Sequence, residues 1–273
     1  MKKLAILIVL VILLAGSTAY AHFQLLIPSR IVVTGIAPQE INLSMPFAHP
    51  MEGGPFMEMK KPMKFGVMVN GEKVTLDNIL KSHKIPVFKK WNPEFKEYKN
   101  KKVTAYYASY SLKRPGNYLF YLVPKPYFEP AEDKFIWQIT KVVVNAYGAE
   151  EGWDSIIGLK AEIVPLVVPY GIWEGNIFRG KVLINGKPAS GIDVEVEYYN
   201  KDGKVKPPVD SLITQVIKTD NEGIFSYAIP WAGWWGFSAL GDGGKMQYKG
   251  KMYPVELDAV MWVKAFSKPK GVE

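Results

Sequence analysis

The sequence predicts an all-β protein that contains two consecutive β-sandwich domains. Glycine and proline are frequent, with 24 and 20 residues among 273, and aromatic residues make up 13% of the chain. This composition is typical of turn-rich β proteins. Short apolar or alternating segments recur between turn signals, which is the pattern of a sandwich. No long segment has helical periodicity.

The first domain is expected to span residues 22–165. Residues 64–69 form a predicted strand that runs into Asn70-Gly71, a dipeptide that favours a hairpin turn. Residues 103–112 lead through the turn at 114–117 to a return strand at 118–123, and a further apolar strand is expected at 135–144.

The second domain is expected to span residues 172–268, after a stiff linker at 164–171 that holds two prolines. Ile192, Val194 and Val196 alternate with acidic residues, so one face of this strand is expected to point into the core and the other into solvent. The remaining strands are predicted at residues 178–184, 224–229, 234–240 and 260–265.

Residues 1–21 have the three parts of a secretory signal peptide. Lys2 and Lys3 precede an apolar run, and Ala19-Tyr20-Ala21 supplies the cleavage site. The run is about a dozen residues long, whereas a membrane-spanning helix needs about 20. We therefore expect a periplasmic or secreted protein that begins at His22 and has no transmembrane segment in its mature part.

The charge and the lack of cysteine exclude several kinds of partner and site. The formal net charge of +8 becomes +6 without Lys2 and Lys3, leaving 32 basic against 26 acidic residues. Export makes nucleic acid an unexpected partner for this basic chain. Because the chain has no cysteine, disulfides, thiolate metal sites and lipid attachment through cysteine are all excluded.

His22 is a candidate metal ligand because cleavage after Ala21 would place a free α-amine on the same residue as an imidazole. These two nitrogens can close a six-membered chelate ring on one metal ion. Nitrogen ligands of this kind suit Ni²⁺, Cu²⁺ and Zn²⁺. The alternative is a terminus that frays in solvent.

A second candidate is His49, which lies in a loop stiffened by nearby prolines and glycines. Met51, Glu52 and Met57 follow and are candidate additional ligands. A thioether would favour copper, and a carboxylate would favour nickel or cobalt. We expect the first strand to place His22 within about 10 Å of His49, since metal–nitrogen bonds are near 2 Å. His83 lies between lysines and is expected to be solvated.

Two acidic clusters, at residues 129–133 and 150–154, are expected to form salt bridges or turn caps, with Ca²⁺ binding as the alternative. The sequence contains no Gly-x-Ser-x-Gly elbow, no His-Glu-x-x-His motif and no phosphate loop. We therefore expect a protein that is not an enzyme.

The chain also resembles a family of exported proteins of unknown function that is linked with nickel and cobalt uptake. The similarity is carried by residues 22–29, 47–55, 129–135, 148–154 and 232–236. It implies a periplasmic protein that binds Ni²⁺ or Co²⁺ for a membrane importer. The second half is similar to the transthyretin-like or carboxypeptidase-regulatory sandwich, so the two domains are expected to be immunoglobulin-like or transthyretin-like.

Three other functions stay open from the sequence. The chain is a copper-handling protein if histidine and methionine both bind the metal. It is a redox enzyme if the N-terminal histidine forms a copper brace that acts on polysaccharides. It is a scaffold or adhesion module if the sandwiches bind no metal.

Overall fold

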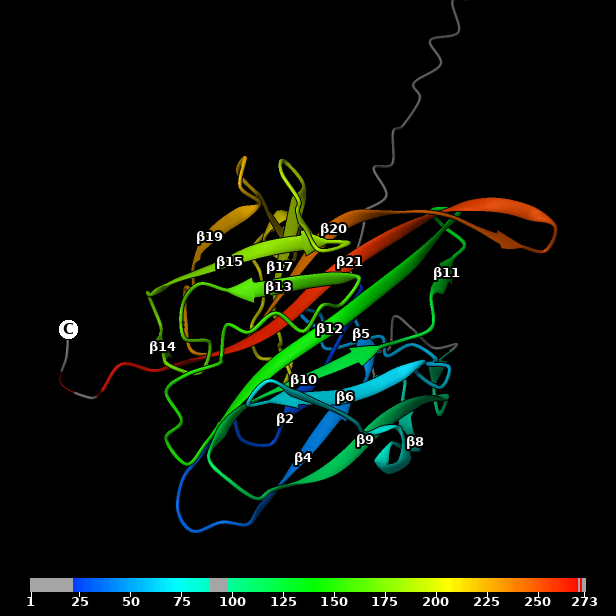
Figure 1. Ribbon diagram of the computed structural model, residues 1–273. Coiled ribbons are helices and arrows are strands. Elements are labelled where there is room, and N and C mark those ends of the chain that lie inside the picture. The colour runs from blue at the N-terminus through cyan, green and yellow to red at the C-terminus, as the bar shows by residue number, and fades with distance from the viewer. Residues whose placement is uncertain (1–21, 89–97, 270, 272–273) are drawn as a thin grey trace, which may run out of the picture.

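The computed structural model describes residues 22–88, 98–269 and 271, so the predicted signal peptide lies outside the described residues. The described chain is all-β, as predicted, with short 3-10 helices at η1 (Asp77–Ile79) and η3 (Asp210–Leu212). The strands form three layers (Figure 1), in which a large central sheet lies between two smaller sheets.

The central sheet contains strands from both predicted domains. Its path follows β18 (Gln215–Lys218), β17 (Asp193–Tyr198), β20 (Gly233–Tyr248), β21 (Lys251–Phe266), β12 (Lys134–Ala146), β10 (Gly116–Val123), β6 (Lys64–Val69) and β7 (Glu72–Thr75). Three short strands join its sides: β3 (Val32–Val33), β11 (Tyr127–Glu129) and β14 (Ile172–Trp173).

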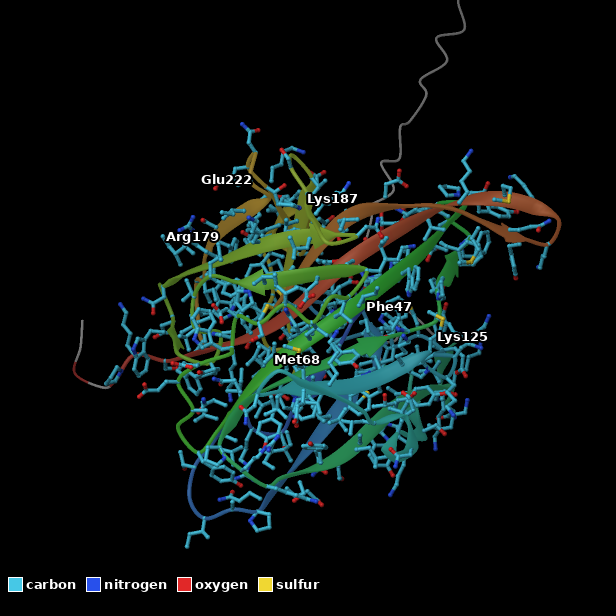
Figure 2. All side chains as sticks on the ribbon, viewed as in Figure 1. Phe47, Met68, Lys125, Arg179, Lys187 and Glu222 are labelled. Atoms are coloured by element: carbon cyan, nitrogen blue, oxygen red, sulfur yellow. The ribbon has the colours of Figure 1, made fainter. Side chains whose placement is uncertain are left out.

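Smaller sheets cover the two faces of this layer. One consists of β2 (Ile27–Pro28), β4 (Gln39–Met45), β9 (Lys102–Leu112) and β8 (Lys81–Pro86). The other consists of β13 (Ala161–Pro165), β15 (Ile177–Ile184), β16 (Lys187–Pro188) and β19 (Ile224–Ala228). In Figure 2, Lys187 and Glu222 project from the outer side of this second layer, whereas Phe47 lies in the interior.

Alternation along the central strands produces two separate hydrophobic cores. In β12, Val142 and Val144 point into the core beneath β4 and β9, whereas Ile139 and Val143 point into the core beneath β13 and β15. Successive side chains of a strand point to opposite faces. A strand with buried residues at every position, as most of β12 is, therefore indicates a sheet that is covered on both sides.

The predicted segments 22–165 and 172–268 both contribute strands to the central sheet, so the two sandwiches share this middle layer, and the domain bounds stay a prediction. The junction is the parallel pairing of β12 with β21, from Phe135 opposite Val255 to Val142 opposite Trp262. β13, from the first segment, pairs with β15 of the second. Both halves of the chain contribute strands to the central sheet, so the two halves are joined through it.

The predicted hairpin of residues 103–112 and 118–123 is wrong. β9 lies in the outer sheet with β4 and β8, whereas β10 lies in the central sheet between β12 and β6. The turn at 114–117 crosses from one layer to the other, and Tyr110 packs against Phe120 across the core, with 5.3 Å between the ring centroids. Turn residues mark where a strand ends, but they do not decide which sheet the next strand joins.

Candidate functional site

His22 and His49 lie side by side. β1 (Phe23–Gln24) pairs antiparallel with β5 (Phe47–Ala48), with Phe23 opposite Ala48 and Gln24 opposite Phe47. Continued by one residue, this register sets His22 opposite His49, and their ring centroids are 4.4 Å apart. The prediction that the first strand brings the two histidines together is confirmed. Their predicted role as metal ligands is not decided by this distance.

The position of β1 depends on Gly236 of β20. A Cβ atom there would lie 3.0 Å from Phe23 Cδ1 and 2.8 Å from the Trp262 ring. Phe23 and Trp262 are both fully buried and pack edge to face, with 5.7 Å between their centroids. The missing side chain at Gly236 therefore leaves room for the aromatic pair that holds the first strand against the central sheet.

Glu129, at the end of β11, is the carboxylate beside His22. Its Oε2 lies 3.2 Å from His22 Nε2, and the two side chains are only 12% and 10% exposed. The rings of Phe47 and Tyr127 lie 5.7 and 5.8 Å from the His22 ring. Glu129 was expected to form salt bridges, but its pairing with His22 was not predicted, because 107 positions separate the two residues in the sequence.

This contact orients the His22 imidazole. When Nε2–H donates to a carboxylate, the lone pair of the neutral ring is on Nδ1. Nδ1 is the ring nitrogen that can close a six-membered chelate with the α-amine of the same residue. Carboxylates that hold the far nitrogen of a metal-binding histidine commonly play this orienting role.

The loop after His49 is held by the second half of the chain. The Met51 amide donates to Glu197 Oε2 at 3.0 Å, and Asn200 Nδ2 donates to the Met51 carbonyl at 2.9 Å. Burial and the nearby Asp210 carboxylate raise the pKa of Glu52. Glu52 is exposed, and Met51 is buried. A ligand role for either residue stays a prediction.

Two other methionines lie nearer to β1 and β5. The Met57 amide donates to the Phe47 carbonyl at 2.9 Å, which places this residue beside the strand that precedes His49. Gln24 Nε2 lies 3.9 Å from the Met59 sulfur. His83, by contrast, is exposed and stacks on Tyr107 at 5.0 Å, in agreement with the expectation that it is solvated.

The remaining acidic residues of the two predicted clusters are mostly engaged in surface contacts or exposed. Lys251 Nζ lies 3.1 Å from Asp133, and Lys134 contacts Glu132. Glu150, Glu151 and Asp154 are exposed. Within the described ranges, no group of three or more His, Cys, Asp or Glu side chains is arranged so that it could hold a metal ion as it stands.

The expected solvent face of β17 is buried, which corrects the sequence analysis. Glu197 is 1% exposed, and burial raises its pKa to about 8, although Thr214 and the Met51 amide donate hydrogen bonds to it. Burial and the Glu256 carboxylate raise the pKa of Glu195 to about 7. The alternating pattern is present, but the loop after His49 contacts Glu197 through the Met51 amide, and Asp193 and Glu195 are only partly exposed.

The raised pKa of Glu195 predicts a pH dependence of stability. A carboxyl group that binds its proton more tightly in the folded state stabilises the fold at low pH and loses this contribution as pH rises from about 4.5 to about 7. The groups that act on it are Glu256, Lys134, Glu132 and Asp193.

We expect Glu195→Gln to flatten this slope. It should raise the free energy of unfolding at pH 8 by on the order of 2 kcal/mol relative to the unmodified protein, after allowance for partial solvent exposure. Urea unfolding at pH 5 and pH 8 measures the change. A gain of the same size at both pH values would contradict the assignment.

A pocket of about 360 Å³ lies near His22, although neither His22 nor His49 lines it. Phe47, Tyr127 and Gln138 line it and also surround His22. Lys60 and Lys125 contribute to the opposite part of its lining, and Lys125 lies at the edge of the molecule near β11 (Figure 2). The pocket therefore connects the surroundings of His22 with solvent.

Fold and site together define an all-β protein of layered sandwiches, in which a histidine pair lies at the paired ends of β1 and β5. The chain belongs to the family described as "Domain of unknown function (DUF4198)", whose model matches residues 19–243. This description assigns no activity. The link to nickel or cobalt that the sequence resemblance implies stays a prediction. No functionally curated protein matches the chain.

The chain is also similar to solved structures, at low sequence identity. The D0-D1 domain of intimin is 12% identical, with 90% of this chain and 100% of that chain covered and a TM-score of 0.23. A 1.5-MDa bacterial ice-binding adhesin is 9% identical, with 90% and 65% covered and a TM-score of 0.24. The major pilin subunit of Bacillus cereus is 13% identical, with 91% and 69% covered and a TM-score of 0.19. TM-scores this low give no information about function.

A search of the described residues for a helix with the length and apolar character needed to cross a membrane finds none. The predicted signal peptide and the periplasmic or secreted location stay predictions.

Proposed function

We propose that this protein binds Ni²⁺ or Co²⁺ outside the cytoplasm, through His22 and His49, and delivers the ion to a membrane importer. The observation that carries the proposal is the contact between the two imidazole rings, 4.4 Å apart, with Glu129 on the far nitrogen of His22. These groups come from three separate strands or loops, and the sheet pairing fixes two of them relative to each other.

The chemistry depends on processing of the chain. Cleavage after Ala21 converts the His22 amide into an amine, which supplies one nitrogen, while Nδ1 supplies a second and His49 a third. Three nitrogens are a suitable donor set for first-row divalent ions. An amide nitrogen coordinates only after it loses its proton, so the uncleaved chain lacks one strong donor. Glu129 keeps the His22 ring in the orientation that chelation needs.

The neighbouring pocket gives the ion a route and leaves room for further oxygen ligands. Water, or a ligand that arrives with the metal, can complete the coordination of Ni²⁺ or Co²⁺ from this side. Among the residues that the structure describes, no group of three or more His, Cys, Asp or Glu side chains encloses an ion here, which is consistent with an ion that is released again. Release is what a delivery protein requires, and we include in the proposal that the protein is not an enzyme.

A copper-handling function is the second candidate, favoured by the two methionines near β1 and β5. Met57 is bonded through its backbone to Phe47, and the Met59 sulfur lies next to Gln24. Thioether sulfur prefers soft ions, above all Cu⁺. A small movement of either side chain toward His22 would convert a nitrogen site into a mixed nitrogen and sulfur site.

Calorimetric titration of the correctly processed protein with Ni²⁺, Co²⁺, Cu²⁺ and Cu⁺ tests the proposal. We expect one ion per chain, with Ni²⁺ or Co²⁺ bound more tightly than Cu⁺. Tighter binding of Cu⁺ would favour copper handling, and no binding of any ion would favour a scaffold or adhesion module. Oxygen consumption that depends on a reductant would instead indicate the redox enzyme.

A further inference from the structure

Asp258 of β21 is a fully buried carboxylate with one oxygen unsatisfied. Its exposed fraction is 0%, and Gln138 Nε2 donates to Oδ2 at 3.1 Å. Within the described residues, Oδ1 has no hydrogen-bond partner. A buried acceptor without a partner is rare and costly in folded proteins, so the position indicates a donor or cation that binds there.

The charges around Asp258 are predominantly negative. Glu195 and Glu256 both act on it electrostatically, and burial together with these carboxylates raises its pKa well above the usual range. Lys134 is the cation of this group, but it is already engaged with Glu256 at 2.8 Å and with Glu132. Another positive charge would therefore be stabilised at this place.

The backbone of His22 lies next to this carboxylate. The same Gln138 Nε2 that donates to Asp258 also donates to the His22 carbonyl, at 2.5 Å, and the Gln24 amide donates to Gln138 Oε1 at 2.6 Å. In an extended chain, the nitrogen and the carbonyl of one residue lie on the same edge. When β1 is continued by one residue, the α-nitrogen of His22 lies on the same edge as its carbonyl, which faces Gln138 of β12.

We propose that Asp258 is the binding site for the N-terminal ammonium group that signal cleavage creates on His22. Before cleavage this nitrogen is an uncharged amide, and Lys134, which acts on Asp258, is engaged with Glu256 and Glu132. After cleavage the ammonium group and the carboxylate form a buried ion pair that fixes the first strand. The inference rests on the processing that the proposed function also requires.

Four proteins test the inference by thermal unfolding in the presence of a chelator. They are the chain that begins at His22 and the chain that retains Ala21, each with Asp258 or with Asp258→Asn. In the processed chain we expect the substitution to lower the midpoint temperature by about 10 °C. In the chain with Ala21 the shift should be at most a third of this value. Equal shifts in the two backgrounds would overturn the inference.

Asp133→Asn in both backgrounds is the matched control, because Asp133 is an exposed carboxyl group paired with Lys251. It should give the same small shift with and without Ala21. If the processed Asp258→Asn protein does not fold, the rate at which the His22 α-amine is acylated in the unsubstituted protein tests the ion pair instead. A rate well below that of a free histidyl peptide supports the ion pair, and an equal rate overturns it.

Mass spectrometry of the N-terminus keeps this result separate from the proposed function. The unfolding measurements need only a free amine at His22 and no metal. A protein that shows the difference between backgrounds but binds no metal ion would refute the metal proposal and retain the ion pair.

Discussion

His49→Ala is expected to weaken Ni²⁺ binding by the processed protein about 100-fold. Loss of an outer-shell partner alone costs about 10- to 100-fold in metal affinity, and His49 would be a direct ligand. Its side chain lies against His22 at 4.4 Å, so the substitution removes one of three nitrogens. Calorimetric titration measures the loss, and circular dichroism shows whether the fold is kept.

His83→Ala is the matched control, since His83 is exposed and stacked on Tyr107. It should bind Ni²⁺ as the unsubstituted protein does. Glu129→Ala should give an intermediate loss of about tenfold, because the His22 ring loses its orienting carboxylate. Equal affinities for His49→Ala and His83→Ala would show that His49 is not a ligand.

Glu162→Gln is expected to lower the free energy of unfolding by about 3–5 kcal/mol. Lys141 Nζ lies 2.7 Å from Glu162 Oε1, and both side chains are 1% exposed. Glu162 also accepts hydrogen bonds from the amides of residues 157–159. Without its negative charge, Lys141 is left as an uncompensated cation in the core between β12 and β13. Burial already lowers the pKa of Lys141.

Chemical denaturation measures this loss. Asp133→Asn serves as the surface control, because its partner Lys251 is exposed and such pairs contribute about 0–1 kcal/mol. Adding Lys141→Met to Glu162→Gln should recover part of the stability, since the buried charge is then gone. A loss for Glu162→Gln no larger than that for Asp133→Asn would contradict the assigned role.

The strands were predictable where the pattern of side chains was local. β6 covers the predicted residues 64–69, and the Asn70-Gly71 turn leads into β7 with both residues at positive φ. β17 and β19 occupy the predicted positions within one residue. Residues 241–244 were not predicted as strand, because three glycines and an aspartate are typical of a turn. In the structure β20 continues through them with an irregularity in its register.

The arrangement of the strands could not be predicted from such local patterns. The parallel pairing of β12 with β21 joins segments more than 100 residues apart, and no turn connects them. The burial of Glu197 in β17 has the same cause. The glutamates of this strand form an alternating pattern typical of a solvent-facing edge, but the distant loop after His49 contacts Glu197 through the Met51 amide.

The candidate site was predictable in part. His22 was identified from the cleavage site and His49 from its stiff loop, and the structure brings them together through β1 and β5. Glu129 and Asp258 were not connected with them. A single carboxylate in a strand has no sequence signal for its partner, and only the fold places these two next to His22 and Gln138.

The measurement that tests the metal proposal most directly compares two forms of the same protein. One begins at His22, and the other retains Ala21, so they differ in whether the His22 nitrogen is an amine or an amide. Calorimetric titration with Ni²⁺ should show at least tenfold tighter binding by the form that begins at His22, which corresponds to about 1.4 kcal/mol. Equal affinities of the two forms would contradict the proposal that the N-terminal amine binds the metal.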